Sequence, residues 1–229
     1  MATPRFTHPL PESHRRDHAG PNQRLHGLYA ITPDEADTPK LIHQVKLALE
    51  GGTRWIQYRN KSANNGLKRQ QAEALAALCG RYNAALIIND DIELAKTSGA
   101  HGAHLGREDA SLTAAKSLLG ENKIIGASCY DQIERAVEAE EQGADYVTFG
   151  SFHPSSVKPH AARPPVHLLT QARTKLTVPV VAIGGITLEN AGVLIEAGAE
   201  AVAVINALFN APDIETAAKK FNDLFANRQ

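Results

Sequence analysis

A single α/β domain, folded as a (β/α)8 TIM barrel, is the architecture that the sequence predicts. Three features indicate it: the length of 229 residues, short apolar runs that alternate with longer amphipathic stretches, and a recurring glycine turn. Such a barrel typically has about 250 residues, and a chain of this size buries a core without disulfides. An open doubly wound sheet is the alternative. It is disfavoured because no glycine fingerprint opens the first helix, as a dinucleotide site requires.

The apolar runs are short and nearly continuous, which is typical of parallel strands covered by helices on both faces. Eight strands are predicted, at residues 27–32, 54–59, 85–89, 103–105, 123–128, 146–150, 180–184 and 201–205. Helical periodicity is expected between them, for example at 39–50, 66–82, 131–141 and 188–196. Eight alternating units over about 200 residues favour closure into a barrel.

A glycine turn recurs where a helical stretch ends and a strand begins. Glycine there can take the left-handed conformation that ends a helix and redirects the chain into the sheet. The four turns are Gly51-Gly52-Thr53, Gly99-Ala100, Gly143-Ala144 and Gly198-Ala199.

The bulk composition narrows the classes of partner. Lys and Arg number 24 against 25 Asp and Glu, which gives a formal net charge of −1. No nucleic acid or anionic membrane is therefore expected to bind through bulk charge. The two cysteines show no pairing pattern and suit a reducing cytoplasm. No apolar run approaches the ~20 residues of a membrane span.

The first 24 residues differ from the rest of the chain. They are rich in Pro, His and Arg, lack apolar periodicity and lack the apolar core of a secretory signal. We expect a flexible arm over 1–24 and a barrel domain over 25–229.

Chemistry in such barrels gathers at the carboxyl ends of the strands, where the βα loops converge. The second predicted strand ends in Gln57, Arg59 and Lys61, which alternation places on one side. An arginine fork and a lysine point charge beside an amide suit a phosphate-bearing ligand. Solvated loop charges are the alternative interpretation.

Carboxylates follow the next two predicted strands. Asn89, Asp90 and Asp91 come after the third strand, and Asp109 comes after the fourth. One of Asp90 and Asp91 is expected to cap a helix. Adjacent βα loops can bring Asp90 close to Asp109, and Mg²⁺ is commonly held by one or two carboxylates with phosphate oxygens and water. Beside the cationic strand end, this pattern favours a metal–diphosphate site.

The remaining strand ends are also polar. Ser128 ends the fifth strand, and the loop at 150–159 is dense in hydroxyls and carries a lysine. Gly184 and Gly185 follow the seventh strand, and Asn206 begins a helical stretch after the eighth. Many barrels place a phosphate site at these last two loops. Two phosphate-competent regions on one face indicate two phosphorylated ligands or one long ligand.

Taken together, these strand-end motifs resemble one family, the thiamine phosphate synthases, in order and spacing from Leu28 to Phe209. The motifs are LYAIT, QYRNK, LIINDD, HLGRED, IGAS, GADYVTFGSFHPSSVKP, VPVVAIGGI and GAEAVAVINALF. The resemblance implies a Mg²⁺-dependent transferase of thiamine biosynthesis. It would join 4-amino-2-methyl-5-(diphosphooxymethyl)pyrimidine to 4-methyl-5-(2-phosphoethyl)thiazole, or to its carboxylated form, and release pyrophosphate.

The resemblance also assigns roles to single residues. For the pyrimidine diphosphate it implies Gln57, Arg59, Lys61, Asn89, Ser128 and Lys158. For the thiazole phosphate it implies Ser155, Val157, Gly185, Ile205 and Asn206, with Ser156 as a substitute hydroxyl. For Mg²⁺ it implies Asp90 and Asp109. The resemblance further implies that Arg59, Lys61 and Lys158 are catalytic cations, which would neutralise the leaving group in a dissociative substitution.

Two departures from the family pattern concern the thiazole phosphate end. The loop Pro-Thr-x-Thr-Lys reads Pro154-Ser155-Ser156-Val157-Lys158 here, so one hydroxyl is missing, and Asn206 stands where the family has serine. We expect these changes to affect affinity for the thiazole phosphate more than the chemistry.

Two other functions remain open at this point. A thiazole tautomerase of the same barrel family would need a histidine just after the strand-five serine, where Cys129 and Tyr130 stand here. A non-catalytic barrel that senses a phosphorylated metabolite would have no need of paired aspartates and a cationic leaving-group site. A homo-oligomer is compatible with this class of barrel.

Overall fold

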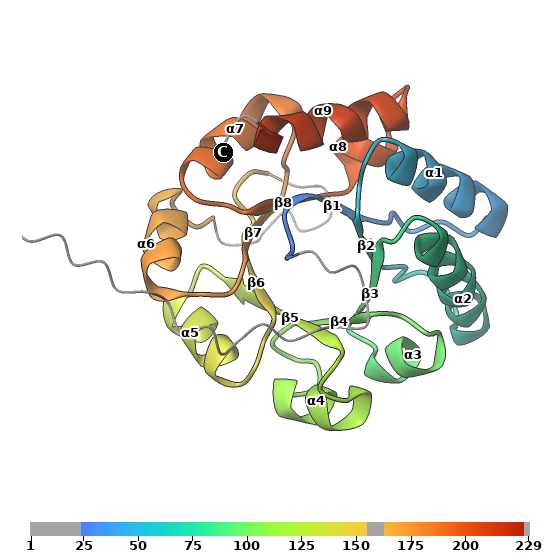
Figure 1. The fold of residues 1–229 in the computed structure, drawn as a ribbon, viewed down its shortest axis with the longest axis horizontal. Helices are drawn as coiled ribbons and strands as arrows, with labels where there is room; N and C mark the ends of the chain where they lie inside the picture. The colour runs from blue at the N-terminus through green and yellow to red at the C-terminus, as the bar shows by residue number, and fades with distance from the viewer. Residues whose placement is uncertain (1–23, 155–162, 227–229) are drawn as a thin grey trace, which may run out of the picture.

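The computed structural model describes residues 24–154 and 163–226. Eight parallel strands pair in chain order, and β8 pairs with β1, so the sheet closes into a barrel. Figure 1 shows the helices as a ring around it. The prediction of a (β/α)8 barrel is confirmed.

The strands agree with the predicted runs to within two residues at either end. They are β1 (Gly27–Ile31), β2 (Trp55–Tyr58), β3 (Ala85–Asn89), β4 (Gly102–Leu105), β5 (Ile124–Tyr130), β6 (Tyr146–Phe149), β7 (Val180–Ile183) and β8 (Ala201–Val204).

Helices follow each strand, and those predicted by periodicity are present, α7 with the predicted ends and the others with ends shifted by one or two residues. They are α1 (Thr38–Glu50), α2 (Asn65–Arg81), α3 (Ile92–Thr97), α4 (Leu112–Leu119), α5 (Ile133–Glu141), α6 (His167–Lys175), α7 (Leu188–Glu196), α8 (Asn206–Phe209) and α9 (Ile214–Ala226). The main difference lies after β5, which continues through an irregular register to Tyr130 and so delays the start of α5 to Ile133.

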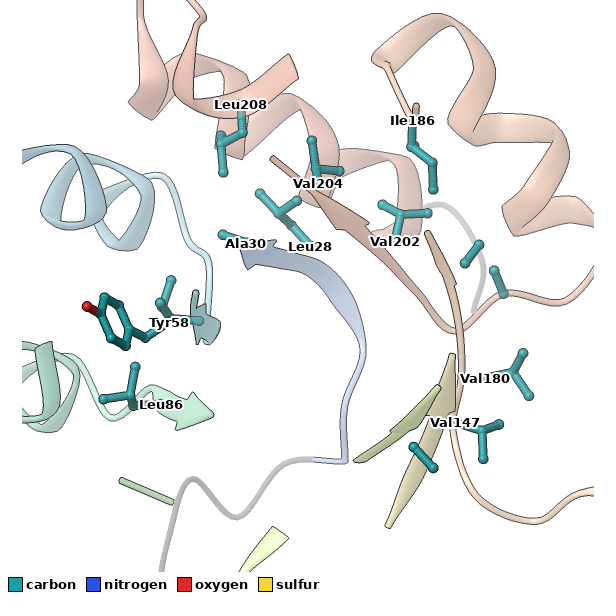
Figure 2. Packing of buried hydrophobic residues seen from close by; sticks show 14 of the residues in the cluster. Leu28, Ala30, Tyr58, Leu86, Val147, Val180, Ile186, Val202, Val204 and Leu208 are labelled. Carbon is teal, nitrogen blue, oxygen red and sulfur yellow. The ribbon is translucent and has the colours of Figure 1, made fainter. Parts of the chain in front are cut away.

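Alternation along each strand divides the core into two layers. Leu28 and Ala30 face outward into a layer shared with the helices, whereas Tyr29 and Ile31 face the barrel interior. Figure 2 shows the outer layer, with Leu28 of β1 beside Val202 and Val204 of β8. The interior layer closes the centre of the barrel and supports the strand ends that carry the site.

The predicted glycine turns form as expected. A positive φ is found at Gly52 (93°), Gly99 (76°), Gly143 (89°) and Gly198 (120°), each just before a strand. A side chain would be strained in this conformation, so glycine suits these turns.

Within residues 24–154 and 163–226, no helix combines the length and apolar character that crossing a bilayer requires.

Candidate active site

A polar pocket of about 520 Å³ opens at the carboxyl ends of β2 to β5. It is lined by Arg59, Lys61, Asn89, Asp90, His104, Gly106, Arg107, Glu108, Asp109, Ser128, Tyr130, Asp131 and Gln132. The lining therefore combines cations with carboxylates. Six of the sequence-predicted site residues share this lining: Arg59, Lys61, Asn89, Asp90, Asp109 and Ser128.

The end of β2 is fixed by the loop after β1. The buried Thr32 hydroxyl accepts a hydrogen bond from the Arg59 amide and donates one to the Arg59 carbonyl, both at 2.9 Å. Asp34 Oδ1 accepts from Arg59 Nη1 at 3.0 Å and from the Lys61 amide at 2.9 Å. The loop after β1 thus holds the Arg59 guanidinium and the main chain of Arg59 and Lys61.

The two aspartates after β3 have different roles. Asp91 is the N-cap of α3, and its carboxylate accepts from the Leu94 amide at 2.8 Å. Asp90 has a left-handed backbone, with a φ of 64°, and its side chain lies in the pocket. A non-glycine residue in that conformation is uncommon and is often found at functional sites. The structure therefore assigns the cap to Asp91 and leaves Asp90 to the pocket.

Asp90 lies between a carboxylate and a cation. Its carboxyl group is within hydrogen-bonding reach of Asp109, and Lys61 Nζ is 3.5 Å from its Oδ2. Burial, and then the neighbouring Asp109, raise the pKa of Asp90 above its usual value, while Lys61 acts in the opposite sense. The Gly106 amide donates to Asp109 Oδ2 at 2.6 Å and fixes that carboxylate.

This pair of carboxylates fits a hard divalent cation that is also bound by a ligand. Two carboxyl groups within reach of each other do not readily ionise together unless a cation lies between them. In the described part of the chain, no group of three or more His, Cys, Asp and Glu side chains could hold a metal. Mg²⁺ usually keeps several waters and binds one or two carboxylates together with substrate phosphates, so the incomplete protein shell is suited to it.

Ser128 enters the pocket from β5 next to His104 of β4. Its Oγ is 2.9 Å from His104 Nε2, and its carbonyl accepts from Arg135 Nε at 3.2 Å. Tyr130, two residues on, has a positive φ of 57°, and the guanidinium of Arg107 lies 5.8 Å from the centre of its ring. No histidine occupies either position after Ser128.

Gln57 lies deeper than the sequence suggested. It is only 3% exposed, it faces the barrel interior, and its Nε2 donates to Tyr29 OH at 3.0 Å. It is not among the residues that line the pocket.

The ends of β7 and β8 lie across the same face. A side-chain carbon on Gly185, which has a φ of 60°, would overlap the carbonyl of Pro154, so the turn after β7 runs against the loop after β6. Asn190 Nδ2 donates to the Gly185 carbonyl at 3.0 Å. Ile205 and Asn206 begin α8 directly after β8. The predicted contacts Ser155, Ser156, Val157 and Lys158 lie outside the described residues.

Three contributors to the site were not recognised from the sequence: Thr32, Asp34 and His104. The first two follow the first strand, so the rule that polar residues gather at strand ends would have found them. His104 lies within a strand, where a structural role is the usual expectation, yet it lines the pocket and contacts Ser128.

The closed barrel and its strand-end pocket of paired aspartates and cations define an enzyme of the (β/α)8 class that acts on small phosphorylated molecules. The chain belongs to the thiamine monophosphate synthase family, whose sequence model matches residues 28–208.

Individual relatives agree with this assignment. The thiamine-phosphate synthase of Thiobacillus denitrificans is 52% identical over 200 residues, covering 87% of this chain and 95% of that protein. The corresponding enzyme of Nitrosospira multiformis is 51% identical over 92% of this chain and 90% of its own. The solved thiamine phosphate pyrophosphorylase of Pyrococcus furiosus superposes with a TM-score of 0.78 at 34% identity, covering 87% of this chain and 95% of that one.

Proposed function

We propose that this enzyme joins the pyrimidine diphosphate to the thiazole phosphate and releases thiamine phosphate and pyrophosphate. A C–N bond forms between the exocyclic CH₂ of the pyrimidine and the thiazole nitrogen, and the C–O bond to the diphosphate breaks. The observation that carries the proposal is the contact of Lys61 with Asp90, which is itself in reach of Asp109. Cations beside paired carboxylates are what a metal-bound diphosphate leaving group needs.

Arg59 and Lys61 would stabilise the negative charge that develops on the departing pyrophosphate. Thr32 and Asp34 hold the Arg59 guanidinium and the main chain of both residues in advance, so little reorganisation is needed at the moment of bond breaking. Lys158, in the loop outside the described residues, is proposed as the third cation. Asn89, which is half-buried at the end of β3 and lines the pocket, would contact the same substrate.

Asp90 and Asp109 would hold Mg²⁺, with the remaining ligands supplied by the diphosphate and water. When bound, the metal supplies charge neutralisation at the leaving group. Because the aminopyrimidine can stabilise a cation at its CH₂, no protein nucleophile or strong base is required. The side chains then contribute mainly by holding the two substrates side by side.

The thiazole phosphate would bind across the ends of β6 to β8. Gly185 lets the main chain approach closely, and Ile205 and Asn206 stand at the next strand end. Ser155, Ser156 and Val157 would complete this end of the site. In the same proposal, residues 1–24 are a flexible arm, the barrel over 25–229 is the catalytic domain, and the enzyme works in the cytoplasm.

The test is a reaction of purified protein with both substrates and Mg²⁺, with thiamine phosphate measured by chromatography. Parallel samples lack the thiazole phosphate, contain EDTA, or contain an Asp90→Ala/Asp109→Ala double variant. Product is expected only in the complete reaction with the wild-type protein. A folded wild-type protein that forms no product at saturating substrates would refute the proposal.

A further inference from the structure

A continuous chain of hydrogen bonds crosses the barrel interior below the pocket. Gln57 Nε2 donates to Tyr29 OH at 3.0 Å, and Tyr29 OH lies 2.7 Å from Tyr146 OH. Tyr146 OH is 3.0 Å from His104 Nδ1, and His104 Nε2 is 2.9 Å from Ser128 Oγ. We call these five residues the barrel relay. It begins at a buried amide and ends at a hydroxyl in the pocket wall.

The relay is rigid and its phenols stay protonated. Tyr29 and Tyr146 are fully buried, and this burial raises the pKa of both phenols. The Tyr146 ring stacks on the His104 imidazole with centroids 5.5 Å apart and planes at 20°. Each phenol therefore carries one proton in a fixed setting, and low-dielectric surroundings strengthen the hydrogen bonds it makes.

Because each phenol has a single hydroxyl proton, the hydrogen bonds of the relay run in one donor-to-acceptor direction. Tyr29 accepts from the Gln57 amide, and we infer that its own proton goes to the Tyr146 oxygen, because a buried phenol proton without an acceptor would be costly. Tyr146 then donates its only proton to His104 Nδ1, which requires the imidazole proton on Nε2. His104 Nε2–H donates to Ser128 Oγ, and the hydroxyl proton of Ser128 is left for an acceptor in the pocket.

We propose that Tyr29, Tyr146 and His104 are positioning residues that fix Ser128 as a hydrogen-bond donor, so that the pocket selects a substrate with an unprotonated ring nitrogen beside Ser128. The inference rests on the proposed function, in which an aminopyrimidine occupies this pocket. A 4-aminopyrimidine has such nitrogens, whereas its 4-oxo analogue carries a proton on one of them. The opposite polarity would need Gln57 to turn its carbonyl oxygen towards Tyr29 and every proton in the relay to reverse.

Nitrogen NMR on the ¹⁵N-labelled wild-type protein tests the direction without any substitution. We expect His104 as the Nε2–H tautomer, with Nδ1 unprotonated. The Nδ1–H tautomer would overturn the inference, because Ser128 would then donate to His104 rather than to the substrate.

A double-mutant cycle tests the function of the relay. Tyr146→Phe is expected to raise the KM for the pyrimidine diphosphate about five- to tenfold, the size of one lost hydrogen bond, with the KM for the thiazole phosphate unchanged. In a Ser128→Ala background the same change should have less than about a twofold effect, since both variants remove one interaction. Tyr29→Phe provides a second variant at the preceding step.

Tyr58→Phe is the matched control. Tyr58 is as buried as the relay tyrosines, and its hydroxyl donates to Gln71 Oε1 at 2.8 Å outside the relay, so its effect should be equal in both backgrounds. If the effects of Tyr146→Phe and Ser128→Ala on this KM are fully additive in an active synthase, the relay inference is overturned and the proposed function still stands. Absence of synthase activity in the wild type, measured in the same series, would instead refute the proposed function.

Discussion

Asp34 and Arg59 form an ion pair at the rim of the pocket, with Asp34 Oδ1 at 3.0 Å from Arg59 Nη1. The same oxygen accepts a hydrogen bond from the Lys61 main-chain amide at 2.9 Å, so one carboxylate holds both the Arg59 guanidinium and the Lys61 main chain. Asp34 comes from the loop after β1 and Arg59 from the end of β2, which are adjacent in the barrel. The neighbouring βα loop thus holds the Arg59 guanidinium and the Lys61 main chain, the two residues proposed as catalytic cations.

Replacing Asp34 with alanine should lower kcat/KM for the pyrimidine diphosphate by about 10- to 100-fold, because Arg59 and Lys61 lose their alignment. Asp34→Asn keeps an acceptor oxygen, so its kcat/KM should lie between those of Asp34→Ala and the wild type. Steady-state kinetics with varied pyrimidine diphosphate would measure this. Glu200→Ala, which breaks the exposed Arg24 pair elsewhere on the barrel, is the control and should be neutral. An Asp34→Ala enzyme as active as that control would disprove the alignment role.

The adjacent aspartates after β3 should behave oppositely when each becomes asparagine. Asp90→Asn is expected to reduce activity at least about 100-fold and to raise the Mg²⁺ concentration needed for half-maximal rate, because a metal ligand loses its charge. Asp91→Asn should retain activity within about twofold, since asparagine caps a helix about as well as aspartate. Magnesium titrations of the initial rate compare the two. Equal losses in both variants would contradict the assignment of Asp90 to the metal and Asp91 to the cap.

The largely buried ion pair between Lys116 of α4 and Asp145 should matter for stability and not for catalysis. Lys116 Nζ lies 2.8 Å from Asp145 Oδ2, which also accepts from the Ile125 amide at 2.8 Å. Lys116→Met leaves a largely buried carboxylate without its cation, so we expect a loss of about 3 kcal/mol and a Tm lower by roughly 10 °C. Scanning calorimetry gives the Tm. The exposed pair of Lys46 offers the control Lys46→Met, for which Tm should hardly change.

Gly126 of β5 leaves the space in which the barrel relay packs. A side-chain carbon there would overlap the Tyr146 ring and the His104 imidazole. Gly126→Ala should therefore destabilise the fold by about 1–3 kcal/mol and raise the KM for the pyrimidine diphosphate. Gly80→Ala in α2, where an added carbon meets nothing within 4 Å, should stabilise the helix slightly. Denaturant unfolding and kinetics on both variants measure this, and an unchanged KM in Gly126→Ala would count against the relay.

Strand positions were predictable because each strand is an apolar run bounded by turn residues. β3 and α7 begin and end at the predicted residues, and Trp55 packs in the interior core as expected for a large aromatic residue. The extension of β5 to Tyr130 was not predictable, since it depends on an irregular pairing with β6 that has no local sequence signature.

The site was predictable to the extent that it follows strand ends. Asp90, Asp109 and Lys61 lie together as the alternation and loop adjacency indicated. Which of Asp90 and Asp91 caps the helix could not be predicted, because an aspartate at either position suits a cap and only the backbone angles distinguish them. The relay could not be predicted, since Tyr29 and Tyr146 are 117 positions apart and meet only when the barrel closes. The roles of Ser155, Ser156, Val157 and Lys158 remain predictions.

The most direct measurement is a time course of pyrophosphate and thiamine phosphate from one reaction, first in EDTA and then after Mg²⁺ is restored. The account predicts neither product in EDTA, and both products in a 1:1 ratio once Mg²⁺ is present, with no pyrophosphate when the thiazole phosphate is omitted. Pyrophosphate release without the thiazole phosphate, or full product formation in EDTA, would contradict the proposed metal-dependent condensation.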